Sequence, residues 1–343
     1  MNSSTSPSIK RRLQWADIAK GIGILAVIVG HLGVDSINRV VFTFHMPLFF
    51  LLAGYFFSQK PWKVFLPQKA KTLLQPYFFT GLLVIIGNVF YAIPNHQAFY
   101  AVKDWILGVL FANGSDVPSL LPVPSVGAIW FLWAMFWALL FLNLIANKPY
   151  TPILVLLLGF VSYLTAKQFW LPLDIQAGGF ALLFVYAGYL CKQKQLFEKK
   201  QPLILFFVCL VFWLWCMIHF KGFWMVSNFC GNGILDIIGG FAGSYCIVYI
   251  CKWIEQLAPL LSKILIFYGK NSLVVLCLHL LELNLFPWHL VLNPLSQYGI
   301  VGWKSTVLII ILKIALLTIA TALCLRSKFL CRIFSVKRNL PNC

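Results

Sequence analysis

The stretch WADIAKGIGILAVIVGHL, residues 15–32, combines an apolar run of membrane-spanning length with three ionisable side chains. A helix that crosses a bilayer needs about 20 mostly apolar residues. The ionisable side chains are Asp17, Lys20 and His31. A charge at mid-bilayer costs about 2.5–3.5 kcal/mol on insertion scales, so each of the three is a candidate functional group. The stretch therefore predicts a membrane helix that carries a site.

The composition of the whole chain supports a membrane protein. Of its 343 residues, 61% are apolar and 10% are charged, and the mean hydropathy is +0.86. Soluble domains have about 45–50% apolar and about 25% charged residues, so the composition argues against a water-soluble globule. The net charge of +18 is typical of basic cytoplasmic loops, and we expect contact with membrane lipids but no nucleic-acid partner. The ten cysteines form no C-x-x-C motif, and we expect no metal.

The distribution of apolar residues predicts an all-α, polytopic membrane protein with about ten transmembrane helices. Placing both termini in the cytoplasm puts 19 of the 27 Lys and Arg residues on the inner side, as the positive-inside rule requires. We expect a cytoplasmic lead over 1–16, a membrane domain over 17–326 and a basic cytoplasmic tail over 327–343. The stretch 99–112 is interpreted as an interfacial or re-entrant segment. The expected spans are 17–34, 40–57, 73–93, 126–146, 150–166, 172–191, 202–220, 233–251, 264–286 and 305–325.

The spacing within the first span places its polar residues on one face. Lys20 and His31 are eleven residues apart, which is three helical turns plus roughly 20°, and about 16 Å along the axis. Asp17 is one turn from Lys20 and can pair with it. A snorkelling interfacial pair is an alternative interpretation of Asp17 and Lys20. A helix–helix hydrogen bond is an alternative interpretation of His31.

Other polar residues at membrane depth extend the candidate site. In the second span His45 is expected near the depth of His31, and in the ninth His279 and Glu282 lie one turn apart on one face. Asn271 lies nearer the inner side of the same span, whereas Trp130 and Asp174 are expected near the outer side and are candidates for substrate binding. The inner loop after the second span is a candidate phosphate site because of its lysines, Lys60, Lys63, Lys69 and Lys71.

These residues resemble the motifs of the acyltransferase 3 family of integral membrane acyltransferases. Within that family the chain looks most similar to single-domain O-acetyltransferases related to fucose 4-O-acetylase and the enterobacterial-common-antigen acetylase. The resemblance covers nearly the whole chain. It lies in the basic-x10-His pattern of Lys20 and His31, in FHMPLFF at 44–50 with AGY at 53–55, in WFL at 130–132, and in Asn271-Ser272 with His279.

One motif departs from the family pattern. The family often has two arginines three residues apart before a Leu-Leu-x-Pro-Tyr run. Here Lys69 and Thr72 occupy those positions, and Lys71 is a candidate substitute for the second charge.

The resemblance implies transfer of an acyl group, usually acetyl, from cytoplasmic acetyl-coenzyme A to a sugar hydroxyl on the other side of a bacterial plasma (inner) membrane. The acceptor sugar is expected on a surface glycan or a lipid-linked glycan. A neutral imidazole can take the hydroxyl proton, and His31 is the expected base, aided by His45, His279, Asp17 and Glu282. An acyl-His31 intermediate is an open alternative. The expected donor-binding residues are Lys20, Lys63, Lys69, Lys71 and Asn271.

Two other functions fit ten helices with buried charges. One is a transporter or flippase of a lipid-linked glycan, although the chain lacks the inverted repeat and paired broken helices typical of transporters. The other is a polytopic glycosyltransferase that uses a polyprenyl-phosphate sugar. We expect such an enzyme to need acidic residues in its first outer loop, where this chain offers only Asp35.

Overall fold

The structure is a computed structural model that describes residues 13–95, 98–118, 123–199, 202–297 and 301–336. The first half of the described chain consists of helices α1 (Gln14–Gly30), α2 (Asp35–Val41), α3 (His45–Tyr55), α4 (Trp62–Lys69), η1 (Ala70–Leu74), α5 (Gln75–Ala92), η2 (Ile93–Asn95), α6 (Ala98–Phe111), η3 (Gly127–Ile129), α7 (Trp130–Ile145) and α8 (Thr151–Thr165).

The second half adds η4 (Pro172–Asp174), α9 (Ile175–Gln193), α10 (Leu203–Ile218), α11 (Ile234–Leu257), α12 (Pro259–Lys270), α13 (Ser272–Leu285), α14 (His289–Gln297), α15 (Trp303–Arg326) and α16 (Lys328–Ile333). Strands β1 (Phe223–Trp224) and β2 (Phe229–Cys230) form a short antiparallel hairpin. The prediction of an all-helical protein is therefore confirmed apart from this hairpin.

The number of helices that could cross a membrane is smaller than the ten predicted. Among the described residues six helical segments are long and apolar enough, and a bent pair brings the number to seven. A helix occupies each predicted span, but α1, α8 and α10 have only 17, 15 and 16 residues. The side of the membrane on which each terminus lies stays a prediction.

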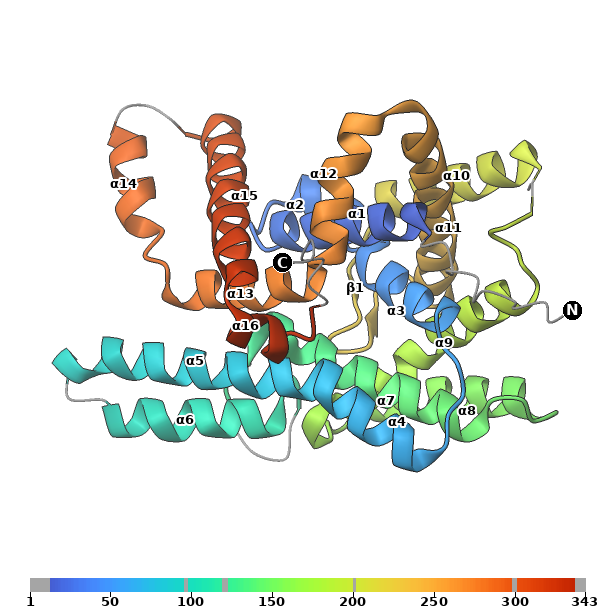
Figure 1. Ribbon diagram of the computed structural model, residues 1–343, viewed down its shortest axis with the longest axis horizontal. Coiled ribbons are helices and arrows are strands. Elements are labelled where there is room, and N and C mark those ends of the chain that lie inside the picture. The colour runs from blue at the N-terminus through green and yellow to red at the C-terminus, as the bar shows by residue number, and fades with distance from the viewer. Residues whose placement is uncertain (1–12, 96–97, 119–122, 200–201, 298–300, 337–343) are drawn as a thin grey trace, which may run out of the picture.

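The ninth predicted span differs most from expectation. In place of one straight helix, α12 and α13 meet at Asn271 with a bend of 72°. The apolar pattern continues through both halves, so the pattern alone does not reveal the bend. The segment predicted as interfacial or re-entrant is helix α6, which packs along α5 (Figure 1).

Close helix contacts at glycine hold the walls around the site. α1 packs on α12, where the Cα of Gly21 faces the backbone of Leu265 and that of Gly269 faces the backbone of Asp17. α3 packs on α9 in the same way, through Gly54 and Gly188. A Cβ at any of these four glycines would collide with the backbone of the partner helix. Small residues at such contacts are typical of membrane helix pairs.

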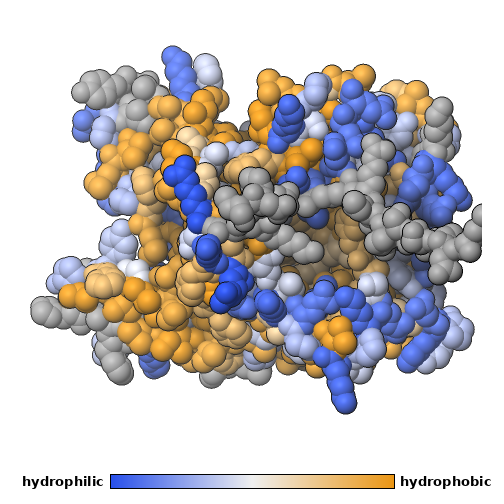
Figure 2. All heavy atoms as spheres, in the orientation of Figure 1, coloured by the Kyte–Doolittle hydropathy of each residue, from blue (hydrophilic) through white to orange (hydrophobic). Residues whose placement is uncertain are grey.

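The outer surface of the described chain is strongly apolar. Figure 2 shows hydrophobic side chains over much of one face, including the region of α5 and α6. On α8, Ile153, Leu156 and Phe160 are each at least 60% exposed. Exposing so much apolar surface to water costs free energy, so we expect these side chains to face lipid.

Candidate active site

A cavity of about 970 Å³ lies between α1, α3, α7 and α13. The face of α1 that lines it carries Lys20, Ile24, Val27 and His31 in helical order. Lys20 and His31 therefore lie on the same face of the helix, as their spacing predicts. Because a helix rises 1.5 Å per residue, the two residues lie about 16 Å apart along the cavity.

The end of the cavity near Lys20 is cationic. Lys69 and Lys270 line it together with Lys20 and Thr72. The ammonium groups of Lys20 and Lys69 lie 5.2 and 5.7 Å from the ring centres of Phe56 and Phe65. We call this region the lysine end.

A local irregularity of the backbone accompanies the lysine end. The π-helical turn η1 follows Lys69 and contains Thr72, whose hydroxyl donates to the carbonyl oxygen of Gln68 at 2.9 Å. Such π-helical turns inside longer helices occur frequently at functional sites.

The middle of the cavity is apolar. Side chains from α1, α3, α7 and α13 line it there, and they include Ile24, Val27, Phe49, Met135 and Leu276. This stretch separates the lysines from the imidazole groups at the other end. An apolar passage of this kind favours a slender, uncharged group over a charged one.

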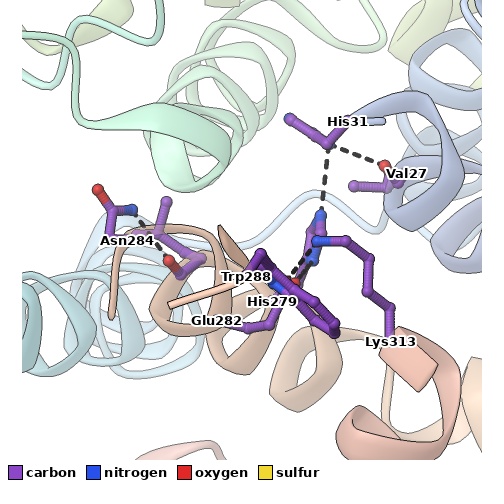
Figure 3. Close-up of polar contacts among 8 residues, drawn as sticks. Val27, His31, His279, Glu282, Asn284, Trp288 and Lys313 are labelled. Atoms are coloured by element: carbon purple, nitrogen blue, oxygen red, sulfur yellow. Dashed lines mark hydrogen bonds and ion pairs between the residues drawn. The ribbon is translucent and has the colours of Figure 1, made fainter. Parts of the chain in front are cut away.

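The opposite end of the cavity, which we call the histidine end, contains a connected set of polar side chains (Figure 3). His31 lines the cavity, whereas His279 is fully buried behind it. His31 Nδ1 lies 3.4 Å from His279 Nε2 and 2.8 Å from the carbonyl oxygen of Val27. His279 Nδ1 lies 2.8 Å from Glu282 Oε2. The candidate base is thus connected to a buried carboxylate through a second histidine.

The partners of these rings fix their tautomers. A carboxylate and a carbonyl only accept hydrogen bonds, so His279 Nδ1–H donates to Glu282 and His31 Nδ1–H donates to Val27. In neutral His279 the lone pair on Nε2 then faces the same Nδ1–H of His31. The remaining nitrogen of neutral His31, Nε2, carries a lone pair and can accept a proton.

Glu282 is anchored by two further donors. Lys313 Nζ and Trp288 Nε1 both donate to its Oε1. The side chains of Lys313 and Glu282 are 6% and 3% exposed. A buried carboxylate is tolerable only when it is paired and hydrogen-bonded, and Glu282 meets both conditions.

The structure brings several predicted residues to the cavity. His45 lines the histidine end, is 3% exposed, and its Nδ1 donates to the carbonyl oxygen of Val41 at 2.6 Å. Trp130 lines the same end. Asp17 lies outside the lining, but its Oδ1 is 3.8 Å from Lys20 Nζ.

Other predicted residues are not brought to the cavity. Lys63 and Lys71 are exposed and do not line it. Asn271 lies at the bend, and its amide donates to the carbonyl oxygen of Phe267 at 2.8 Å. Asp174 is fully buried elsewhere, where its Oδ1 accepts from Trp170 Nε1 at 3.1 Å. The expected contact of Asp174 with substrate therefore has no support in its position.

Sequence reasoning missed two lysines. Lys270 lines the lysine end, and so the third cation comes from α12 and not from Lys71. Lys313 anchors Glu282 from α15. Its signal was present in the sequence, because a lysine inside an apolar span is costly and needs a partner.

Comparison with known proteins gives the family. The model of the acyltransferase 3 family, described as an acyltransferase domain, matches residues 13–325. The chain belongs to this family. Together with the apolar helices, the match makes this protein a membrane acyltransferase.

Similarity to individual proteins is more limited. Nodulation protein NolL of Mesorhizobium japonicum is 30% identical over 138 residues, which cover 35% of this chain and 32% of that protein. The chain thus matches about a third of the length of this curated relative. No solved structure shows significant similarity.

Proposed function

We propose that this membrane acyltransferase transfers an acetyl group from acetyl-coenzyme A to a sugar hydroxyl. The observation that carries the proposal is one continuous cavity with three lysines at one end and an oriented imidazole at the other, Lys20 and His31 being about 16 Å apart along α1. The acceptor is a surface glycan or a lipid-linked glycan outside a bacterial inner membrane. The lysine end then faces the cytoplasm, where the donor is made.

The lysine end suits the donor's polyanionic nucleotide. Lys20, Lys69 and Lys270 attract phosphate groups as point charges. The slender pantetheine arm of coenzyme A matches the apolar passage that follows. The thioester at the end of that arm is then delivered toward His31.

Transfer needs one proton to be moved twice. The lone pair on His31 Nε2 takes the proton of the sugar hydroxyl while the hydroxyl oxygen attacks the thioester carbonyl carbon. The carbon–sulfur bond breaks, and the coenzyme A thiolate leaves with the proton that His31 returns. The products are the sugar ester and free coenzyme A. Trp130, whose indole N–H can only donate, is a candidate to stabilise the developing oxyanion.

The residues behind His31 have positioning roles in this scheme. His279 faces the Nδ1–H of His31 and thereby favours the tautomer with a free lone pair on Nε2. Glu282 holds His279 in turn and stabilises positive charge on the pair, while Lys313 and Trp288 fix Glu282. A base that is held in place by a further hydrogen-bonded group recurs in sites of this kind.

The decisive experiment uses purified protein in nanodiscs with radiolabelled acetyl-coenzyme A and a panel of free and lipid-linked sugars. Free thiol and label on protein or sugar are both followed. His31→Ala is expected to lower kcat by about 10²- to 10⁴-fold, because general-base catalysis is lost. His219→Ala is the matched control, because His219 is an exposed histidine outside the cavity lining.

The same experiment separates the two chemical routes. Label that appears only on sugar indicates direct transfer, whereas label trapped on the wild-type protein and absent from His31→Ala indicates an acyl-histidine intermediate. A folded wild-type protein that neither binds nor turns over acetyl-coenzyme A would refute the donor assignment.

A further inference from the structure

Residues 113–118 form a fixed wall at the histidine end. The carbonyl oxygen of Asn113 accepts from the backbone N–H of Val126 at 2.7 Å, and that of Pro118 accepts from the backbone N–H of Trp170 at 2.8 Å. Gly114 lies between the side chains of Trp130 and Val226, and a Cβ at this position would collide with both. The segment is therefore interlocked with α7 and with the β1–β2 hairpin.

The β1–β2 hairpin forms the wall opposite residues 113–118, and hydrogen bonds anchor it as well. The amide nitrogen of Asn228 donates to the carbonyl oxygens of Ser162 and Gln176 at 3.2 and 2.9 Å. Trp224 lines the cavity and packs edge to face on Phe42, with ring centres 4.4 Å apart. Aromatic surface is thus held next to His31 and His45.

One unpaired polar group lies between these walls. The hydroxyl of Ser115 is buried, lines the cavity and has no hydrogen-bond partner in the described part of the chain. Buried polar groups are normally hydrogen-bonded, so an unpaired one in a cavity indicates a ligand or water position. Asp116 follows directly, and among the described residues that line the cavity it is the only carboxylate.

Asn284 adds a further polar group at this end. Its amide nitrogen donates to the carbonyl oxygen of Leu280 at 2.9 Å, which leaves its oxygen available as an acceptor (Figure 3). The groups that line the histidine end are therefore aromatic faces, hydrogen-bonding oxygens and one negative charge.

We propose that Ser115, Asp116 and Trp224 form an acceptor subsite that binds an uncharged sugar ring and rejects an acidic one. The inference rests on the proposed transfer to a sugar. A pyranose ring has an apolar C–H face that packs on an aromatic ring, and hydroxyls at its edge that donate to Asp116 and Ser115. A uronic acid or sialic acid would bring a second carboxylate toward Asp116, and this repulsion supplies the discrimination.

The test uses matched acceptors that differ only at C6. The pairs are p-nitrophenyl glucoside with its glucuronide and p-nitrophenyl galactoside with its galacturonide. Wild-type protein is expected to favour the neutral member in kcat/KM by at least about tenfold. Asp116→Asn is expected to reduce this preference to within about threefold, and Asp116→Lys to reverse it.

Control variants separate local charge from general damage. Asp104→Asn removes an exposed carboxylate of α6 that does not line the cavity, and its preference is expected to equal that of wild type. Ser115→Ala is expected to raise the KM of both members of a pair equally. Coenzyme A binding by each variant, measured by displacement of labelled donor, reports whether the variant is folded.

Failure of the acceptor subsite and failure of the acetyltransferase proposal give different results in this test. An unchanged preference in a folded Asp116→Asn variant would overturn the subsite, as would wild-type preference for the acidic glycoside. The subsite would also be overturned if the wild-type protein turns over the donor but neither binds nor acylates any of these glycosides. Failure of the donor itself to bind or turn over would instead refute the acetyltransferase proposal.

Discussion

The two ends of the cavity hold charge in different ways. At the histidine end, Glu282 and Lys313 are almost fully buried and His279 lies 2.8 Å from the carboxylate. At the lysine end, the Lys20 side chain is 32% exposed and its ammonium group lies 3.8 Å from Asp17. The difference indicates that a proton-transferring group needs a fixed orientation, whereas attraction of a polyanion needs only the sum of nearby charges.

Among the residues that hold charge at the two ends, the largest effect is expected from replacing the carboxylate of Glu282. Glu282→Gln is expected to lower kcat on the order of 10²-fold, because the amide no longer stabilises positive charge on the histidine pair. Its KM for acetyl-coenzyme A is expected to stay near that of wild type. Steady-state kinetics with labelled donor measure both. A rise in KM without a fall in kcat would contradict the positioning role of Glu282.

A double-variant cycle separates folding from catalysis at the same network. Lys313→Met alone leaves a buried carboxylate without its counter-charge, so the free energy of unfolding is expected to fall by about 3–5 kcal/mol. Lys313→Met with Glu282→Gln is expected to recover most of that stability but none of the activity. Equilibrium unfolding in mixed micelles and turnover of the same samples give the two quantities.

Removing single charges at the lysine end should have smaller effects. Lys20→Met and Lys270→Met are each expected to raise the KM for acetyl-coenzyme A about three- to tenfold with little change in kcat. The KM of wild type should rise with ionic strength, because salt screens exposed charges. Lys63→Met and Lys71→Met are matched controls with no expected change. Equal effects of all four substitutions would show that general surface charge, not the cavity, binds the donor.

The smallest effect is expected for Asp17→Asn. Its carboxylate does not line the cavity and lies 3.8 Å from the Lys20 ammonium group, at the limit of ion-pair distance, so its loss changes the field at the donor site little. The KM for donor is expected to change by less than about threefold, measured beside Lys20→Met in one series. A tenfold change would mean that the lysine end also depends on a fixed orientation.

Much of the candidate site is predictable because helical periodicity is a local property. The eleven-residue spacing of Lys20 and His31 fixes their shared face whatever surrounds the helix. The pairing of His279 with Glu282 follows from their one-turn spacing in the same way. The contact between His31 and His279 was not predictable, because it depends on how two distant helices pack.

The errors in prediction have a common physical origin. The bend at Asn271 is invisible to hydropathy, because α12 and α13 are both apolar, yet the bend lies between Lys270, which lines the cavity, and His279, which is buried behind its other end. Positive charge alone groups Lys63 and Lys71 with Lys69. Orientation around the helix and the turn η1 instead select Lys69 and Thr72.

The glycine contacts of α1 with α12 and of α3 with α9 have a consequence for the size of the transferred group. Backbones that already touch cannot approach further, and the tight fit at Gly21, Gly54, Gly188 and Gly269 opposes sliding of one helix along the other. The spacing within each of these two helix pairs is then fixed, and the side chains that line the passage adjust its width. Acyl-chain length therefore becomes a property that trimming a few apolar side chains can change without altering the frame.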